Sequence, residues 1–396
     1  MAWSTLAFMA FSAVWGFGNV VNGFSEFGGL QAIVSWILIF AIYFVPYALM
    51  VGELGSSFKN LGGGVSSWIS ETINPKIAYY AGWTYWIVHM PYISQKPQGA
   101  IIAGSWAIFQ SNVVSGINPL ILQSACLVLF LVGLMIASKG MNPLKKITAL
   151  AGTSMFVMSI LFIVLMMAAP AITNASFMDI DWSAKTFLPT FDVKYFTSLS
   201  ILVFAVGGCE KISPYVNKVE NPGKGFQRGM IALAIMVAIC AILGTVSLGM
   251  MFKQNEHGVF INGNKLIAVI VSILIIVPAS GIENVDAMVK WLVKLNSVCM
   301  PLHYLWVFVA YIALKKAGEK FVGEYQFTKS KTLGILIGIW CFAFTAFACI
   351  GGMYSEDKFQ LILNIVTPLV LTGLGFIMPM LAEKERVKKG IKEKAV

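Results

Sequence analysis

The sequence has few charged residues. Asp, Glu, Lys and Arg make up only 12% of its 396 positions, while hydrophobic residues make up 58%. A soluble globular domain carries about 25% charged residues, so this composition excludes one. Apolar runs of roughly 20 residues, the length that crosses a bilayer, recur along the whole chain and leave no room for a separate soluble domain. The composition predicts an integral membrane protein whose first apolar run is a transmembrane segment rather than a cleaved signal peptide.

Recognisable catalytic and metal-binding motifs are also missing. The three histidines, His89, His257 and His303, are scattered, and the chain has no HExxH, Gly-x-Ser-x-Gly or phosphate-loop sequence. We therefore expect no metal, no cofactor and no enzymatic activity. The six cysteines lie in apolar stretches without CxxC spacing, which predicts reduced residues used for packing. They are Cys126, Cys209, Cys240, Cys299, Cys341 and Cys349.

The basic residues indicate topology rather than nucleic acid binding. The formal net charge is +10, but Lys and Arg fall in short loops and in the tail, as the positive-inside rule expects. The loop at 211–228 carries a net charge of +3, whereas the loop at 170–194 carries −1. The first loop is therefore expected inside and the second outside, with no nucleic acid partner.

One stretch combines features that are costly in lipid. Residues 204–228 read FAVGGCEKISPYVNKVENPGKGFQR, where the glycine pair Gly207 and Gly208 is followed directly by Cys209, Glu210 and Lys211. Adjacent glycines weaken a helix, and a charge at the bilayer centre costs about 2.5–3.5 kcal/mol. A plain anchor would contain neither feature. The pattern predicts a broken transmembrane helix that lines a wet, solute-binding cavity.

The first span, at about 3–24, holds a second candidate break at Gly16, Gly18 and Asn19, followed by Asn22 and Gly23. Amides freed at a half-helix start hold a carboxylate, and freed carbonyls hold an amine or a cation. A zwitterionic amino acid satisfies both. The two breaks are five spans apart, and this odd offset fits two repeats of inverted topology.

The third span begins near Ile77, and its end is open. If it runs as far as Phe109, Lys96 lies close to the middle of the membrane, where it is a candidate counter-charge to an acidic substrate or a helix end. If it ends at Gln95, Lys96 is an interfacial anchor. The glycine run at 62–64 reads as a flexible connection or as part of a functional loop.

Eleven spans are visible, and the loop charges disagree with that number. Eleven crossings place the basic loop at 315–331 and the basic tail at 383–396 outside, against the positive-inside rule. One further crossing between Phe252 and Glu283 returns both to the inside and makes the C-terminus cytoplasmic. The spans are expected at about 3–24, 31–54, 77–109, 120–137, 147–169, 195–210, 230–252, 266–283, 287–314, 333–352 and 359–382.

Two stretches resemble the amino acid-polyamine-organocation superfamily. Glu53-Leu54-Gly55, followed by Gly62-Gly63-Gly64-Val65-Ser66-Ser67-Trp68, looks like the pattern that ends the second helix of amino acid permeases. Gly207-Gly208-Cys209-Glu210, followed by Glu220-Asn221-Pro222-Gly223-Lys224 and Gly229, resembles the sixth-helix signature of the superfamily. The chain is most similar to the glutamate/γ-aminobutyrate antiporter branch, specifically over residues 1 to about 252.

The resemblance implies an all-α integral membrane fold of the LeuT type, with an inverted 5+5 repeat, discontinuous helices one and six, and twelve spans. The chain would be a single permease domain with a first repeat at about 1–169, an incomplete second repeat at about 195–316, and two further helices at about 333–382. It also implies a substrate bound between the broken helices, a gate at Phe204 and a pH-responsive carboxylate at Glu210. The implied substrate-binding residues are Gly16, Gly18, Asn19, Gly207 and Gly208.

The chain departs from the family at two points. The eighth helix, which supplies cation-binding oxygens in sodium-coupled relatives, is absent between residues 253 and 265. The lysine that some proton-coupled members carry in helix five is replaced, and Met155 holds the matching position. The resemblance therefore implies exchange or Glu210-mediated proton coupling in a bacterial inner membrane, with amino acids and lipid as partners and homo-oligomerisation left open. The alternative is a truncated permease that transports nothing, and no filter sequence favours a channel.

Two site residues have simpler interpretations. Glu210 is either a group that titrates during transport or a charge at the end of a span, paired with Lys211 or Lys218. Phe204 is either a gate or a packing residue, since aromatic residues are common on apolar helices.

Overall fold

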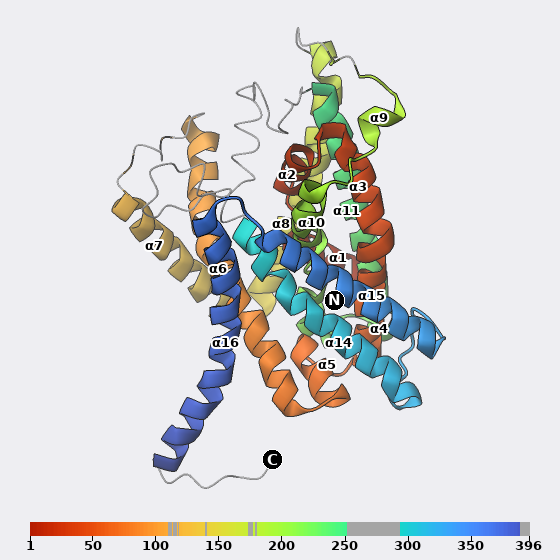
Figure 1. The fold of residues 1–396 in the computed structure, drawn as a ribbon, viewed down its shortest axis with the longest axis vertical. Coiled ribbons are helices and arrows are strands. Elements are labelled where there is room, and N and C mark those ends of the chain that lie inside the picture. Colours follow the sequence, from red (N-terminus) through yellow and green to blue (C-terminus); the bar gives the residue numbers. More distant parts are fainter. Residues whose placement is uncertain are drawn as a thin grey trace.

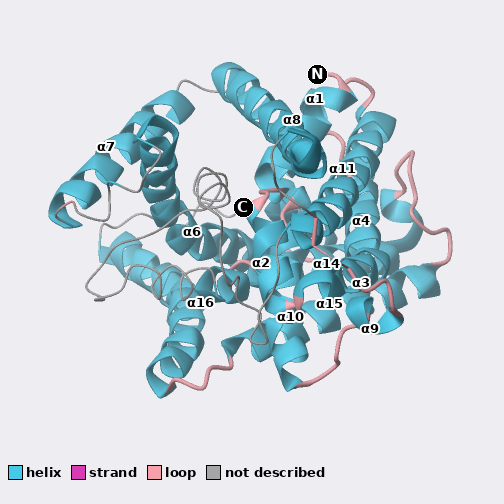
Figure 2. Ribbon diagram, turned by 90° about the horizontal axis from the view of Figure 1, so that it is seen from above, coloured by secondary structure: helices cyan, strands magenta, loops and turns pink. Residues whose placement is uncertain are grey.

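The computed structural model describes residues 1–109, 119–138, 141–172, 180–251 and 294–388, with four single residues between these ranges. Every regular element within them is a helix (Figure 2). An all-α architecture is thus confirmed for the described part of the chain.

The N-terminal helices follow one another with short connections. They are α1 (Trp3–Val14), α2 (Gly18–Glu26), η1 (Gly29–Gln31), α3 (Ala32–Ile39), η2 (Phe40–Phe44), α4 (Val45–Ser57), α5 (Gly64–Thr72), α6 (Pro75–Phe109), α7 (Pro119–Ser138) and α8 (Met141–Ile172).

The remaining helices begin with α9, which lies within the loop at 170–194 that was expected outside. They are α9 (Ala184–Phe187), α10 (Val193–Val206), η4 (Cys209–Lys218), α11 (Pro222–Met251), α14 (Pro301–Ala317), η5 (Gly318–Phe321), α15 (Lys331–Met353) and α16 (Lys358–Lys388).

Ten of the eleven expected spans correspond to helices in the described residues. Seven segments are long and apolar enough to cross a membrane, and the bent pair α1–α2 makes an eighth. The third and fourth expected spans are the helices α6 and α7. α16 runs to Lys388, beyond the expected end of its span at Ala382. The span expected at 266–283, and the eighth-helix region before it, lie outside the described residues.

The first helix is interrupted where the sequence indicated. α1 ends at Val14, Trp15 adopts an extended conformation with φ −98° and ψ 145°, and α2 begins at Gly18. The two segments are bent by 46° relative to each other. No described atom lies within 4 Å of the position that a Cβ on Gly16 would take.

The sixth helix is interrupted at the glycine pair. α10 ends at Val206, Gly207 is extended with φ −80° and ψ 159°, and η4 begins at Cys209. Gly208 has φ 108° and ψ 7°, a backbone conformation that side chains with a Cβ rarely adopt. Glycine at this position therefore permits the break. A Cβ on Gly207 would collide with the ring of Tyr304, which fills the space beside it.

Helix starts follow ordinary capping chemistry. Asp192 accepts a 2.8 Å hydrogen bond from the backbone N–H of Tyr195 at the start of α10, and Ser330 caps α15 in the same way. α6 begins at Pro75 behind the capping residue Asn74. These local signals fix where the spans begin.

The helices form two groups that both views separate. α6, α7 and α16 lie on one side of the molecule, and α3, α4 and α11 lie on the other (Figures 1 and 2). Of the broken helices, α1 packs against α8 and α11, and α10 packs against α15 and α2. The broken helices are therefore held in the interior of the bundle.

The core is rich in aromatic residues, whereas the outer faces of several helices are apolar and exposed. Tyr43, Tyr47, Tyr304 and Phe308 are fully buried and contact one another. All six cysteines are buried and free, as expected. Exposed apolar side chains on α7, α8 and α15 suit contact with lipid. They include Leu127, Val128, Leu134, Met135, Val157, Leu161, Val164, Leu336, Trp340 and Ile350.

A buried ion pair joins the end of α4 to the end of α14. Lys315 donates to Glu53, and the other carboxylate oxygen of Glu53 accepts hydrogen bonds of 2.9 Å from the Tyr311 hydroxyl and from the Phe327 backbone N–H. Lys315 also donates to the Thr328 carbonyl over 2.7 Å. This network ties the connection between α14 and α15 to α4.

Candidate functional site

The two broken helices contact each other at their breaks. The side-chain amide of Asn19 in α2 donates a hydrogen bond over 3.2 Å to the carbonyl oxygen of Ala205 in α10. In a continuous helix this carbonyl would accept from Cys209, but the break at Gly207 and Gly208 frees it. The structure therefore brings the predicted residue Asn19 of the first span against Ala205, which lies in the sixth span between the predicted residues Phe204 and Gly207.

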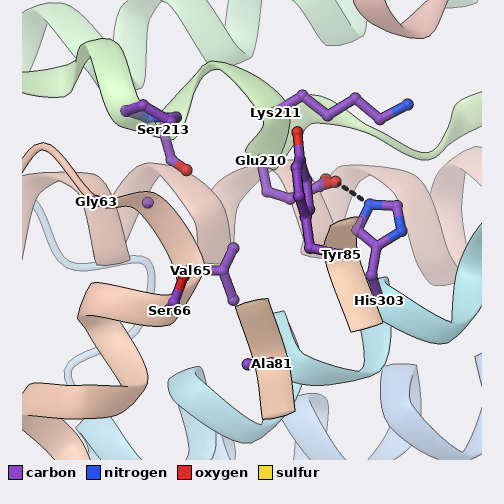
Figure 3. A pocket seen from close by; sticks show the side chains of 11 residues that line it. Gly63, Val65, Ser66, Ala81, Tyr85, Glu210, Lys211, Ser213 and His303 are labelled. Atoms are coloured by element: carbon purple, nitrogen blue, oxygen red, sulfur yellow. Dashed lines mark hydrogen bonds and ion pairs between the residues drawn. The ribbon is translucent and has the colours of Figure 1, made fainter. Parts of the chain in front are cut away.

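Glu210 lies just beyond the second break and is fully buried. The hydroxyl of Tyr47 in α4 donates to one carboxylate oxygen. Nε2 of His303 in α14 lies 2.7 Å from the other (Figure 3). Both side chains of the Glu210–His303 pair are at most 1% exposed. Neither Lys211 nor Lys218, the partners of the simpler interpretation, lies within ion-pair distance of the carboxylate. Glu210 thus links η4 to two other helices.

Two residues of α6 extend this network. The ring centroids of His89 and His303 are 4.8 Å apart, and Tyr85 packs edge-on against His303. Nδ1 of His89 lies 2.5 Å from the carbonyl oxygen of Tyr85. Within the described part of the chain, Nε2 of His89 and Nδ1 of His303 have no hydrogen-bond partner. Two buried imidazoles therefore sit beside the carboxylate with one ring nitrogen each available.

A small cavity opens beside Glu210. It offers about 60 Å³ to water-sized molecules, and because one water needs roughly 10–15 Å³, it holds a few of them. Gly63 and Gly64 of the glycine run line this cavity, and Figure 3 shows Gly63 beside it. The lining residues are Gly63, Gly64, Val65, Ser66, Ala81, Tyr85, Glu210, Lys211, Ser213, Pro214 and His303.

Tyr92 connects the remaining predicted site residues. Its ring packs edge-on against Phe204 with centroids 6.4 Å apart. The ammonium groups of Lys96 and Lys211 lie 4.1 Å and 5.2 Å from the centre of the same ring. α6 is continuous through Lys96 to Phe109, as the longer of the two expected spans requires. Phe204 and Lys96 are therefore neighbours of one ring.

Sequence reasoning did not assign five of these residues to the site. They come from three different helices, and none belongs to a recognisable motif: Tyr47 lies in α4, Tyr85, His89 and Tyr92 lie in α6, and His303 lies in α14. His303 was one of only three histidines in the chain, and that scarcity was the one available signal.

Broken apolar helices that meet beside a buried carboxylate and a small cavity define a membrane transporter of the discontinuous-helix class. Sequence comparison gives the family. The family model for amino acid permeases matches residues 1–252. The chain belongs to this amino acid permease family, and it is a membrane-embedded amino acid transporter.

Individual relatives agree with this assignment. The chain is 42% identical to the aspartate/glutamate permease AcaP of Lactococcus lactis subsp. cremoris, over 98% of this chain and 96% of the relative. It is 25% identical to the inner membrane transporter YjeM of Escherichia coli, over 96% of this chain and 81% of the relative. It is 22% identical to a glutamate/gamma-aminobutyrate antiporter of Lactococcus lactis subsp. cremoris, over 54% of this chain and 42% of the relative.

The alignment with AcaP also measures how much shorter this chain is. It extends over 471 positions, at least 75 more than the 396 residues of the chain, so at least that many positions fall opposite gaps. The family match ends at residue 252, where the span count began to disagree with the loop charges.

Proposed function

We propose that the protein is a secondary active transporter of acidic amino acids that works by alternating access, through exchange or proton coupling. The observation that carries the proposal is the Asn19–Ala205 hydrogen bond, which joins the two broken helices next to the buried Glu210 network. The names of the aspartate/glutamate permease and the glutamate/gamma-aminobutyrate antiporter support acidic substrates.

The backbone at the breaks would hold the groups that all amino acids share. Amide N–H groups freed around Gly16, Gly18 and Asn19 carry a partial positive charge that suits the α-carboxylate. Carbonyls freed near Gly207 and Gly208 suit the α-amino group. The Asn19–Ala205 link would then open and close as the two helices move around the substrate.

Glu210 would carry the proton in a coupled cycle. Its carboxylate contacts a tyrosine hydroxyl and an imidazole nitrogen, which form a hydrogen-bonded route from the interior to the cavity of about 60 Å³. A pH response attributed to Glu210 must allow for every titratable group that faces it. These are Tyr47 from α4, Tyr85 and His89 from α6, Cys209 and Lys211 from η4, and His303 and Tyr304 from α14.

The proposed topology follows the charges. The basic loops and the tail at 383–396 lie in the cytoplasm of a bacterial cell, and the loop at 170–194 lies outside. The first repeat covers about 1–169 and the incomplete second repeat about 195–316. The region after residue 252, beyond the family match, is where the charge pattern calls for one further crossing, and we assign the eighth helix of the family to this place.

The test is a counterflow measurement. The purified protein is reconstituted in vesicles preloaded with unlabelled amino acids, and uptake of a labelled panel of acidic, neutral and basic amino acids is measured at two pH values. We expect counterflow of glutamate and aspartate, with a rate that depends on pH. Counterflow restricted to basic amino acids would contradict the substrate class.

One observation favours a second candidate, a permease that binds but does not transport. The chain lacks at least 75 alignment positions that its relative contains, and the loss of a helix that moves during alternating access would stop the transport cycle. The same vesicles separate the two, because absence of counterflow with every amino acid of the panel supports this second candidate.

A further inference from the structure

Two lysines surround the ring of Tyr92 without a carboxylate partner. The ammonium groups of Lys96 and Lys211 lie 4.1 Å and 5.2 Å from the ring centre. No carboxylate of the described residues lies within 4.0 Å of either. The nearest candidate, Glu210, is occupied by Tyr47 and His303. Like charges close together repel each other, so an anion between them is favoured.

Lys211 lies directly at the second helix break. Its side chain folds back over Gly208, and its ammonium nitrogen would be 3.2 Å from a Cβ at that position. The same side chain lines the cavity beside Glu210 (Figure 3). Lys211 is half-buried, so its charge is only partly hydrated, which strengthens its attraction to an anion. The positive charge therefore stands where a solute held by the broken helices would extend its side chain.

Any amino acid brings one carboxylate and one amine, which the freed amides and carbonyls of the two breaks match. A neutral amino acid has no group that needs the two additional ammonium groups of Lys96 and Lys211, and these groups would repel the side chain of a basic amino acid. An amino acid with a second carboxylate carries the negative charge that complements the two ammonium groups. An ammonium group binds a carboxylate through a charge-assisted hydrogen bond, while the face of Tyr92 holds both cations in place.

We propose that Lys211 and Lys96, positioned by Tyr92, form the subsite for the side-chain carboxylate of an acidic amino acid. Lys211 makes the main contact because it lies at the break, and Lys96 supplies a second positive charge. Phe204, 6.4 Å from Tyr92, borders the subsite. This proposal deepens the proposed function, because it rests on a solute held between the two broken helices.

The first test measures binding and does not require transport. Equilibrium binding of labelled glutamate and labelled glutamine is compared on the detergent-purified full chain. Glutamine has the same α-amino and α-carboxylate groups and nearly the same size, but it lacks the second charge. We expect the wild-type protein to bind glutamate at least about ten-fold more tightly than glutamine.

Substitutions then assign the preference to the lysines. Lys211→Met should raise the Kd for glutamate about ten-fold to hundred-fold and leave the Kd for glutamine unchanged, because a hydrogen bond to a charged group is lost. Lys96→Met should cause a smaller rise. Lys211→Arg, which keeps the charge, should retain most of the preference and shows that the site folds. Lys185→Met in the exposed helix α9 is the matched control and should bind both solutes as the wild type does.

Three results would overturn the subsite. They are a wild-type protein without preference for the acidic solute, an equal loss of glutamate and glutamine binding in Lys211→Met, and normal glutamate selectivity in the double variant Lys96→Met/Lys211→Met. The second result would mean that Lys211 binds the α-carboxylate shared by all amino acids. Counterflow on the same proteins separates this proposal from the proposed function. Selective glutamate binding without counterflow would contradict the proposed transport function and support the subsite. Counterflow of neutral amino acids alone would support the transport function and contradict the subsite.

Discussion

The side-chain amide of Asn19 hydrogen-bonds to the carbonyl oxygen of Ala205, 186 positions further along the chain. Each residue lies next to a helix break, and the bond satisfies a carbonyl that a continuous helix would have paired. One amide thus couples the position of the first broken helix to that of the sixth. Any movement that separates these helices must break it.

Asn19→Ala should impair transport more than it impairs folding. Losing one hydrogen bond costs a net free energy of folding of about 0.5–1.5 kcal/mol, which a large helical bundle tolerates. Without this bond, however, α2 is no longer held in a fixed position relative to α10. Counterflow rate and thermal stability are measured on the same preparation. Asn22→Ala, three residues further along α2, is the control and should transport normally. A fully active Asn19→Ala protein would show that the link has no role in transport.

Glu210→Gln should flatten the pH dependence of uptake. Glutamine keeps the shape and accepts a hydrogen bond from Tyr47, but it cannot gain or lose a proton between pH 5 and 8. His303→Gln should alter the same profile, because its ring nitrogen lies 2.7 Å from the carboxylate. Glu71→Gln, an exposed substitution on α5, is the control. An unchanged profile in Glu210→Gln would assign proton coupling to another group.

Phe204→Leu should weaken substrate affinity while the protein remains folded. Leucine fills much of the apolar space against Val88 and Cys299 but removes the aromatic contact with Tyr92. The apparent affinity for glutamate is compared with the melting temperature. A variant with unchanged affinity and reduced stability would make Phe204 a packing residue, the alternative that its position on an apolar helix allows.

Glu53→Gln should destabilise the fold strongly. It leaves the buried ammonium group of Lys315 without its counter-charge, and removing one partner of a buried pair costs about 3–5 kcal/mol. The melting temperature is measured in detergent, with fluorescence as the readout of unfolding. A melting temperature equal to that of the wild type would mean that the Tyr311 and Phe327 contacts alone hold the connection to α4.

The matched control is a surface pair in the same connection. Lys59 and Glu324 form an exposed ion pair with an N–O distance of 2.6 Å, so Lys59→Gln should have a much smaller effect. Lys59 donates a hydrogen bond to Glu324 and adds a positive charge, and both lower the pKa of that carboxyl. A lowered folded-state pKa contributes its full stabilisation above the ordinary glutamate value of about 4.3 and loses it as the pH falls further, through the lowered pKa of the folded state. The small contribution of this pair should therefore decline below about pH 4.3 and be absent once the pH lies below the lowered pKa of Glu324.

Gly208→Ala should destabilise the protein, whereas Gly16→Ala should not. Gly208 has φ 108°, a conformation that costs a residue with a Cβ roughly 1–3 kcal/mol. Gly16 is not among the glycines with positive φ, and no described atom blocks its Cβ. Melting temperatures compare the two variants directly. Equal stability of both would mean that the sixth-helix break does not depend on glycine.

The breaks were predictable because their cause is local. Gly207 and Gly208 precede an ionisable pair inside one apolar run, and Gly16 and Gly18 interrupt another apolar run. Residues that are adjacent in the sequence were therefore enough to predict where each helix is destabilised. The structure interrupts both helices at these residues. The positions of ten spans were predictable for the same reason, since each apolar run satisfies its own backbone hydrogen bonds.

The partners of the charged residues were not predictable because they depend on packing between distant segments. Glu210 was a candidate from the start, but its contacts Tyr47 and His303 come from helices that the sequence alone does not place beside it. Lys315 was counted as a loop charge, whereas the structure places it in the last turn of α14, paired with Glu53. A single sequence contains no distances, so such pairs become visible only when the helices are assembled.

The burial of all six native cysteines provides an unusually clean background for chemical labelling. A membrane-impermeant maleimide added to sealed vesicles should find no reactive thiol on the folded wild-type protein. A single cysteine introduced at Ser183 would then report which side of the bilayer the 170–194 loop occupies, and one at Lys224 would report the side on which α11 begins.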